Sequence, residues 1–176
     1  LTNMVVRSVA LGIVAVGQTF VMIAASIDLS VAFMISVTAV MASFIMQGDP
    51  SRVPMAIAIV FAIGIFVGAL NGVIITKLKV NPFIATLGVG LLLKGVLNAS
   101  FENFVGSVPK SFQTLGYGAI GPLPISILVL LLVAVIGGFI LVRTRYGAHL
   151  YGVGGSEEVA RLSGLRTDRV MIMAHI

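Results

Sequence analysis

Charged residues and cysteines are scarce in this sequence. Only 10% of its 176 residues are charged, against about a quarter in soluble domains, so polar surface is too limited to cover a water-soluble globule. Cysteine is absent, which excludes disulfides, thiol catalysis and thiolate metal sites. The sequence is instead 59% hydrophobic, in continuous runs rather than the alternation of a membrane barrel. This composition predicts an all-α, polytopic helical membrane protein.

The apolar runs predict about five complete transmembrane helices. Residues 4–47 would form one helix of about 65 Å, twice the hydrocarbon thickness, so the polar cluster at 26–30 must divide them. We expect Ser26, Asp28 or Ser30 to cap the helix after this break. Residues 101–123 form a long hydrophilic loop. The five expected helices cover about 5–25, 30–47, 54–76, 82–100 and 124–142.

Both ends of the sequence indicate a fragment. The first residue is Leu, and the apolar run that begins at Val170 stops after seven residues, whereas a spanning helix needs about 20. We therefore expect residues 1–176 to form a single, incomplete transmembrane domain of a larger protein.

Glycine recurs at every fourth position in the third expected helix. Gly64, Gly68 and Gly72 form two overlapping GxxxG motifs. Small residues at this spacing share one helix face and let membrane helices approach closely. We expect all three to pack against another helix; chance in a glycine-rich apolar sequence is the alternative.

Two ionisable residues fall within apolar stretches. Lys94 lies about 18 Å from the start of its expected helix, at a depth where lysine faces protein or water, or snorkels to the interface. Asp28, in the break, could bind a cation or a proton, but a helix cap is its simpler role.

The stretch 146–169 is polar, rich in glycine and dense in charge, unlike the rest of the chain. It predicts a short helix between two turns. Gly154 and Gly155 supply a flexible entry, Ser156 caps the helix, and Gly164 takes the position just past its end.

The same short helix carries charge at its start and an apolar stripe. Glu157 and Glu158 fall in the first turn and Arg161 near the last, as the helix dipole favours. Thr167 or Asp168 is expected to cap a further helix from residue 170. We interpret this helix as a docking element for a partner; a solvated loop is the alternative. The stripe consists of Val159, Leu162 and Leu165.

The basic residues predict the orientation in the membrane. If 146–169 is cytoplasmic, seven basic residues lie inside and three outside, as the positive-inside rule requires, with Lys94 within a helix. The inner set is Lys77, Lys79, Arg143, Arg145, Arg161, Arg166 and Arg169. The outer set is Arg7, Arg52 and Lys110.

Catalytic and nucleotide-binding motifs are missing. There is no GxxxxGK[ST], HExxH or GxSxG, and neither His149 nor His175 has a second metal ligand at helical spacing. A GxGxxG at 116–121 follows no strand and precedes Pro-Leu-Pro, so it is not a dinucleotide site. Basic residues are spread over loops, which argues against nucleic acid. We expect no catalytic residue, cofactor or metal in this chain.

Four stretches of the sequence carry a joint resemblance to one known family. They are Ile27–Val31, Asn71–Gly72 with Asn81–Gly88 and Lys94–Gly95, Val108–Gly116, and Thr144–Gly147 with Tyr151–Gly164. Together they resemble the permease (membrane) subunits of bacterial ATP-binding-cassette importers, in the ribose/xylose/autoinducer-type sugar branch. The sequence departs from that pattern where Ala25, Ser26 and Ala32 replace glycines, Ser156 replaces Asn, and Val159 replaces Ala.

The resemblance implies a multi-pass subunit of the bacterial cytoplasmic (inner) membrane. Its implied partners are a cytoplasmic ATPase, which binds ATP and Mg, a second permease subunit and a solute-binding protein, within the lipid bilayer. Asp28, Ser30, Asn71 and Lys94 would belong to the pathway or to a structural signature. The ATPase-coupling residues would be Gly155, Ser156, Glu157, Glu158, Ala160, Arg161 and Gly164.

Other functions stay open at this stage. An ion- or proton-coupled secondary transporter would use Asp28 and Lys94 as coupling charges, although no inverted repeat is visible. A membrane-embedded assembly factor is a third alternative. The solute is not readable: a pentose, hexose, inositol or nucleoside would fit, and a branched amino acid fits less well.

Overall fold

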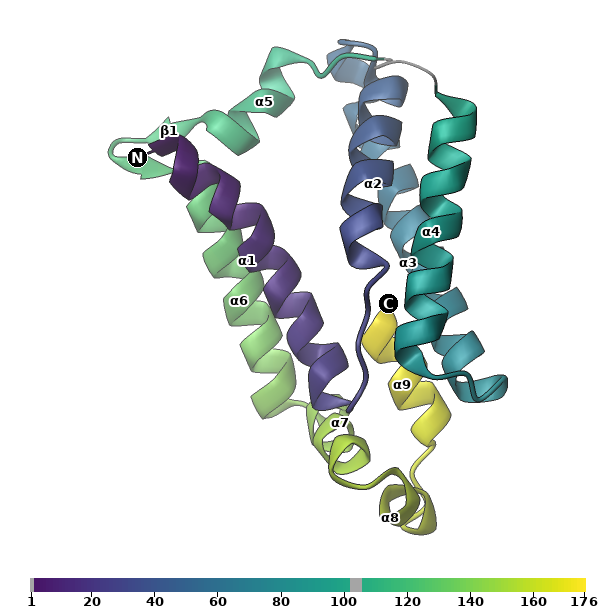
Figure 1. Ribbon diagram of the computed structural model, residues 1–176. Coiled ribbons are helices and arrows are strands. Elements are labelled where there is room, and N and C mark those ends of the chain that lie inside the picture. The colour runs from purple at the N-terminus through teal and green to yellow at the C-terminus, as the bar shows by residue number, and fades with distance from the viewer. Residues whose placement is uncertain (1, 102–105) are drawn as a thin grey trace.

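The structure is a computed structural model that describes residues 2–101 and 106–176, with the side chains of residues 2–7 left undescribed. Helices dominate it, as the sequence predicts, so the all-α class is confirmed (Figure 1). The elements are α1 (Thr2–Ile23), α2 (Val31–Met46), η1 (Pro50–Arg52), α3 (Val53–Lys77), α4 (Pro82–Ser100), α5 (Lys110–Tyr117), β1 (Ala119–Ile120), β2 (Leu123–Pro124), α6 (Ile125–Arg143), α7 (Arg145–Gly155), α8 (Glu157–Leu162) and α9 (Thr167–His175).

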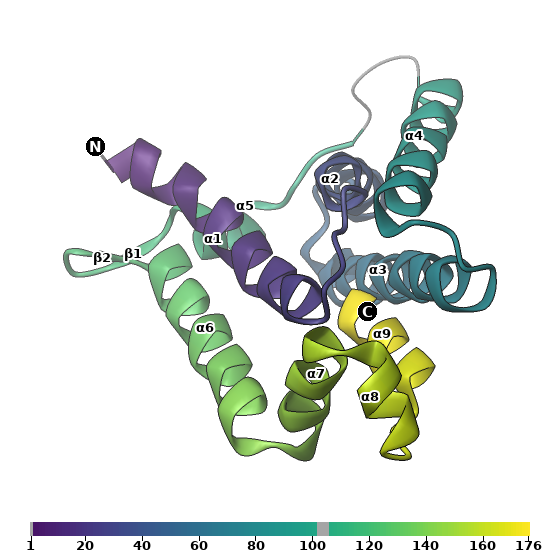
Figure 2. The same ribbon diagram turned by 60° about the horizontal axis from the view of Figure 1, so that its bottom comes forward.

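The long helices form two groups. Helix α1 lies along α6, while α2, α3 and α4 lie together beside them (Figures 1 and 2). Helices α7 and α8 connect the groups at one end, and α5 with the β1–β2 hairpin lies at the other. From the α7–α8 end, α9 turns back along α3.

Three helices in the described part of the chain are long and apolar enough to cross a membrane: α3 (with η1), α4 and α6. Helix α2 has 16 residues, a length of about 24 Å, which is short of a hydrocarbon core of about 30 Å. The non-helical segment 24–30 precedes it. The expectation of five complete spans therefore stays a prediction, because α2 is not a full span by itself.

The predicted break falls where the polar cluster indicates, although it holds neither Gly nor Pro. Ala25 takes a left-handed backbone conformation, with φ of 56°. The Ala25 N–H donates to the Met22 carbonyl (3.0 Å) and the Ser26 N–H to the Val21 carbonyl (3.0 Å). These are the two hydrogen bonds of a Schellman motif, which ends α1.

The predicted hydrophilic loop at 101–123 is more ordered than expected. It contains α5 and the two-stranded hairpin, in which Ala119 pairs with Pro124. Its earlier part is tied to the end of α2, because the Gly48 N–H donates to the Ser107 carbonyl (2.9 Å) and the Ser107 N–H to the Ser43 carbonyl (3.2 Å). Glu102, which belongs to this loop, lies outside the described residues.

The glycine ladder of α3 packs against α9, but only in part. A Cβ on Gly68 would overlap the carbonyl of His175, and one on Gly72 would overlap the backbone of Ile172. Gly64 has nothing within 4 Å of its would-be Cβ, so the prediction that all three share one contact is wrong for it. Other close approaches, which the GxxxG spacing did not indicate, occur at Gly12, Gly90, Gly106, Gly137, Gly147 and Gly154.

Candidate docking surface and polar helix break

Helix α7 replaces the flexible entry that the glycines predicted. It runs through Gly154 and Gly155, so these residues are helical and the prediction is wrong. The physical reason is packing: a Cβ on Gly154 would overlap the carbonyl oxygen of Ile23 at the end of α1. Glycine here permits close contact rather than flexibility. Tyr146 stacks on Phe20 of α1, with ring centroids 6.5 Å apart, and its burial raises the pKa of this phenol to about 12.

Helix α8 has the predicted boundaries and caps. The Ser156 Oγ accepts a hydrogen bond from the Val159 N–H (3.3 Å), and Glu157 and Glu158 occupy the first turn. Gly164 has φ of 85°. The Gly164 N–H donates to the Arg161 carbonyl and the Leu165 N–H to that of Ala160, both at 3.0 Å. A second Schellman motif therefore ends α8.

The two faces of α8 differ in what they contact. Ala160 is 5% exposed and packs with Leu150, Val153 and Val170 of the chain's own core. Val159 is 61% exposed and Leu162 is 83% exposed. The expectation that Ala160 faces a partner is wrong in this structure, because its side chain is already covered by α7 and α9.

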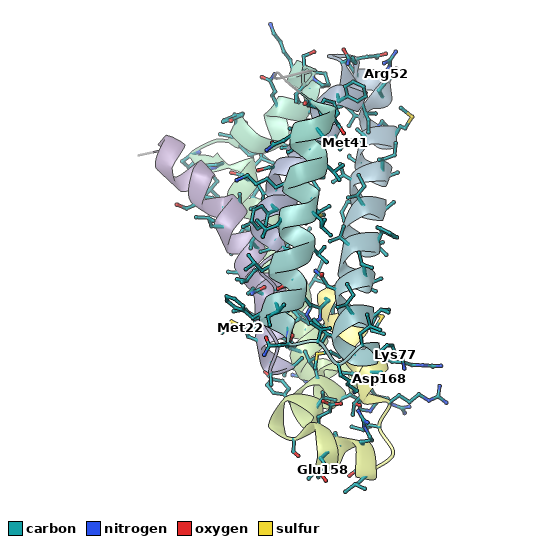
Figure 3. The ribbon with its side chains drawn as sticks, turned by 45° about the vertical axis from the view of Figure 1, so that its right-hand side comes forward. Met22, Met41, Arg52, Lys77, Glu158 and Asp168 are labelled. Atoms are coloured by element: carbon teal, nitrogen blue, oxygen red, sulfur yellow. The ribbon has the colours of Figure 1, made fainter. Side chains whose placement is uncertain are left out.

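The exposed part of α8 therefore forms a smaller stripe than the sequence predicted. Leu165 packs against the same core as Ala160 and leaves the stripe. What remains is an outward surface of Glu158, Val159 and Leu162, which we call the α8 surface. Glu158 lies at the tip of the molecule (Figure 3).

Ion pairs tie α8 to the ends of α3 and α9. The Arg161 guanidinium lies 2.5 Å from the Glu157 carboxylate and 3.6 Å from that of Asp168. The Lys77 ammonium lies 2.5 Å from Asp168, and the two side chains meet in Figure 3. The hydrogen bond from Lys77 holds the pKa of Asp168 below its usual value, aided by the nearby positive charges.

Helix α9 begins earlier than predicted and without the predicted cap. Its first residue is Thr167, after Arg166, and no side chain caps it. The Thr167 hydroxyl instead contacts Arg161 (3.2 Å) and Glu157 (3.4 Å), while Asp168 binds Lys77. The expected cap residues are used to fix α9 against α8 and α3.

The break between α1 and α2 is held by side chains from three other elements. The Asp28 carboxylate accepts hydrogen bonds from the Ser30 N–H (2.8 Å) and Ser30 Oγ (2.6 Å). The Asn71 amide of α3 donates to Ser30 Oγ (2.9 Å). Ser30 and Asn71 are fully buried. Ser30 occupies the N-cap position of α2, but no side chain makes a capping hydrogen bond there, so the predicted side-chain cap is wrong. Asp28 instead stabilises the turn that leads into α2.

Thr86, Gln18 and His175 complete this network. The Thr86 hydroxyl of α4 accepts from the Leu29 N–H (3.0 Å) and donates to the Pro82 carbonyl (2.9 Å). The Gln18 amide donates to the Asp28 carbonyl (3.3 Å). The Leu29 N–H and the Asp28 carbonyl, freed by the break, therefore find partners inside the protein, as suits a non-helical segment at membrane depth.

His175 connects α9 to the break. Its Nδ1 lies 3.0 Å from the Met171 carbonyl, so Nδ1 carries the proton, because a carbonyl only accepts. Its Nε2 then accepts from Ser26 Oγ at 3.2 Å. No role for His175 was evident from the sequence, because no second metal ligand lies at helical spacing from it. No group of His, Cys, Asp or Glu in residues 2–101 and 106–176 has the arrangement of a metal site.

Lys94 stands apart from this cluster. It is exposed on α4 and makes no hydrogen bond or ion pair with Asp28, Ser30 or Asn71. Of the four residues predicted to form a pathway or a structural signature, three thus meet at the break and one does not. The contacts of Asp28, Ser30 and Asn71 are structural ones.

The basic residues separate by end as predicted. Lys77 and α8 lie at one end, Arg52 at the other (Figure 3), and α5 with Lys110 lies at the Arg52 end. Arg7 lies in the first turns of α1, and its side chain is not described. Which end is cytoplasmic remains a prediction of the positive-inside rule.

The geometry is that of a helical membrane protein with exposed apolar side chains on the short helix α8. The chain belongs to the permease family described as branched-chain amino acid transport system / permease component, whose model matches residues 1–176. No solved structure matches the chain.

Curated relatives are similar over nearly the whole chain. It is 34% identical over 184 residues to ribose import permease protein RbsC of Escherichia coli (strain K12), covering 99% of the chain and 56% of that relative. It is 31% identical over 195 residues to galactose/methyl galactoside import permease protein MglC of the same strain (99% and 58%). It is 34% identical over 180 residues to inner membrane ABC transporter permease protein YjfF (99% and 54%).

The chain therefore spans about half the length of the curated relatives it matches. Their names describe import permeases and an ABC transporter permease, and give no support to a secondary transporter.

Proposed function

We propose that this chain is part of the permease subunit of an ATP-driven importer, and that it forms part of the path for a sugar or a related small polar solute. It lies as a multi-pass protein in a bacterial cytoplasmic (inner) membrane. ATP and Mg bind to a separate ATPase, so this chain performs no chemistry itself. The sugar assignment is supported by the ribose and galactose named for two relatives.

The observation that carries this proposal is the α8 surface. Val159 and Leu162 expose apolar side chains on a polar segment outside the membrane-crossing helices. An apolar group left in water is costly, and such exposure marks an interaction site. The partner is a cytoplasmic ATPase, because it must supply the nucleotide chemistry whose motifs are missing here.

The contacts that hold α8 to the neighbouring helices allow a movement of α8 to be passed on to them. Ala160 is packed between α7 and α9, and Arg161 and Lys77 tie α8 to α9 and α3 through Glu157 and Asp168. A displacement of α8 therefore moves α7 and α9 as well. The end with α5 faces the solute-binding protein, and a second permease subunit completes the path.

Orientation is tested by labelling. Single cysteines at Ser111 of α5 and Ser156 of the α8 cap are exposed to an impermeant thiol reagent in intact cells. We expect Ser111→Cys to react and Ser156→Cys to react only after the membrane is opened. The reverse pattern would show that α8 lies outside the cell.

Coupling is tested in the full importer with Leu162→Arg, since Leu162 has almost no contact within its own chain. We expect the affinity for the ATPase to fall by about tenfold, which corresponds to about 1.4 kcal/mol, and sugar uptake to fall with it. The control is Leu115→Arg, an exposed leucine of α5 at the opposite end. It is compared by ATPase co-purification alone, because α5 lies at the end proposed to face the solute-binding protein. Normal ATPase co-purification and uptake with Leu162→Arg would mean that the α8 surface is a solvated loop.

A further inference from the structure

A groove between α2 and α4 gathers polar side chains that the helix break does not use. It has a volume of about 330 Å³, within the roughly 300–1,000 Å³ of small-molecule sites. Helices α2 and α4 lie side by side in Figures 1 and 2. The lining consists of Ala32, Phe33, Ser36, Lys94, Leu97 and Asn98.

The polar residues of this groove have no partner within the described chain. Among residues 2–101 and 106–176, Ser36, Lys94 and Asn98 form no hydrogen bond or ion pair. All three are exposed. By contrast, Asn71 and Thr86 of the adjacent break are buried and bonded. Unpaired polar groups are unfavourable in lipid, so this groove is better suited to water or a polar ligand than to lipid chains.

The three polar residues of the groove lie at increasing distances from the end of the molecule that carries α5. Asn98 lies about 3 Å, and Lys94 about 9 Å, from the end of α4 at 1.5 Å per residue. Ser36 lies about 15 Å from the end of α2 by the same measure. Lysine could reach the interface by snorkelling, but a serine at Ser36's depth is too short.

Ser36 also differs from the described threonines of the long helices. Thr19, Thr38 and Thr76 each donate to a carbonyl of their own helix, at 2.7 to 2.8 Å. Such a bond satisfies a hydroxyl in an apolar setting. Ser36 makes none, so its hydroxyl is free to bond a molecule in the groove.

The lining has the chemistry that suits a neutral polyol. Lys94 donates hydrogen bonds, while Asn98 and Ser36 both donate and accept. Phe33 supplies an apolar ring, fixed against α4 because a Cβ on Gly90 would overlap it. No carboxylate lines the groove, and the Lys94 ammonium opposes cations. A sugar offers matching hydroxyl edges and C–H faces.

We propose that this groove is a sugar-binding station on the transport path. Lys94 and Asn98 bond sugar hydroxyl groups, Ser36 bonds them deeper in the groove, and Phe33 contacts the C–H face of the ring. The assignment rests on the proposed function, and it gives that function specific residues for its solute.

The first test measures access to the groove in the full importer, reconstituted in liposomes. Single cysteines at Ser36 and Leu92 are treated with a charged, water-soluble methanethiosulfonate. Leu92 is 70% exposed on an apolar face of the same helix as Lys94. We expect Ser36→Cys to react at least tenfold faster than Leu92→Cys, and to be protected by a transported sugar. Equal rates, or no protection, would overturn the assignment.

The second test measures uptake of radiolabelled D-ribose, D-xylose, D-galactose and myo-inositol. We expect Lys94→Leu to lower kcat/KM by about tenfold, as for a lost charged hydrogen bond, and Lys94→Arg to restore it. If the unaltered importer transports a sugar and Lys94→Leu stays within twofold of it, the groove assignment alone is wrong. If the unaltered importer transports none of the four, the sugar assignment within the proposed function is wrong, while its ATPase coupling is tested separately by Leu162→Arg.

Discussion

The ends of α1 and α8 have the same backbone hydrogen bonds in opposite surroundings. At each end, the third residue past the helix donates to the carbonyl five residues earlier: Ser26 to Val21, and Leu165 to Ala160. Near the α1 end, the polar side chains are buried and bonded to one another. On α8, apolar side chains are exposed without a partner in this chain.

This comparison shows that local sequence terminates a helix while the surroundings decide its role. The Schellman motif needs only a residue that tolerates a left-handed conformation. At α8 that residue is Gly164, and at α1 it is Ala25, with φ of 85° and 56°. The end of α1, with its polar side chains, is covered by its own chain. The end of α8, with its apolar side chains, is exposed and available to another protein.

The largest effect is expected from a change beside the end of α1. Gly154→Ala places a Cβ on the carbonyl oxygen of Ile23, and a backbone group cannot move aside as a side chain can. We expect destabilisation beyond the usual overpacking cost of about 1–3 kcal/mol. Folded yield in detergent is measured by size-exclusion chromatography.

The matched control is Gly155→Ala, the next residue in α7. Nothing lies within 4 Å of its would-be Cβ, and its φ is not positive. If Gly154→Ala and Gly155→Ala give equal yields, the α1 end is not closed off by α7 as described.

The second-largest effect is expected where α3 contacts α9, the helix whose His175 bonds to the break. Gly68→Ala overlaps the His175 carbonyl, whereas Gly64→Ala enters open space on the same helix face. We expect Gly68→Ala to cost about 2–3 kcal/mol and Gly64→Ala to cost little. Thermal unfolding in detergent compares them. Equal midpoints would show that α9 does not depend on close contact with α3.

A smaller effect is expected when one hydrogen bond of the break is removed. Thr86→Val keeps the side-chain shape but leaves the Leu29 N–H without its acceptor. An unsatisfied buried donor costs about 1–3 kcal/mol. Thr76→Val is the control, because that hydroxyl bonds only the Gly72 carbonyl of its own helix. A midpoint as low for Thr76→Val as for Thr86→Val would contradict a special role of Thr86.

The smallest effects are expected from exchanging glycine and alanine at the two helix ends, Gly164 of α8 and Ala25 of α1. A left-handed conformation costs a non-glycine residue about 1–2 kcal/mol, and glycine loses about 0.5–1 kcal/mol in chain entropy. Gly164→Ala is therefore expected to destabilise α8, and Ala25→Gly to stabilise the break by about 0.5–1 kcal/mol. Unfolding midpoints test Ala25→Gly, and hydrogen exchange at Leu165 tests Gly164→Ala. Opposite signs would show that these backbone conformations are wrong.

Local rules predicted much of this molecule. Hydropathy placed the ends of the long helices to within about three residues. The Ser156 and Gly164 caps of α8 were correct because caps act over a few residues. The break at 26–30 was correct because no other polar cluster divides the first apolar run.

Contacts between distant segments were not predictable in the same way. Spacing put Gly64 and Gly68 on one face, but only the path of α9 decides which of them is covered. The orientation of Ala160 depends on α7 and α9, since a helix of one or two turns has no clear apolar period. Thr86 and His175 serve a backbone segment far away in sequence, and no local signal marks that role.

The absence of side chains on α3 at Gly68 and Gly72 affects how α9 can move. Interlocked side chains resist a shift along the helix axis, because each must leave its hole before entering the next. The α9 backbone that lies against Gly68 and Gly72 meets no such side chain on α3. Sliding α9 along α3 therefore loses less contact than moving α9 away from α3 would. The Ser26–His175 hydrogen bond and the Lys77–Asp168 ion pair then set the register of α9, and a slide must break both.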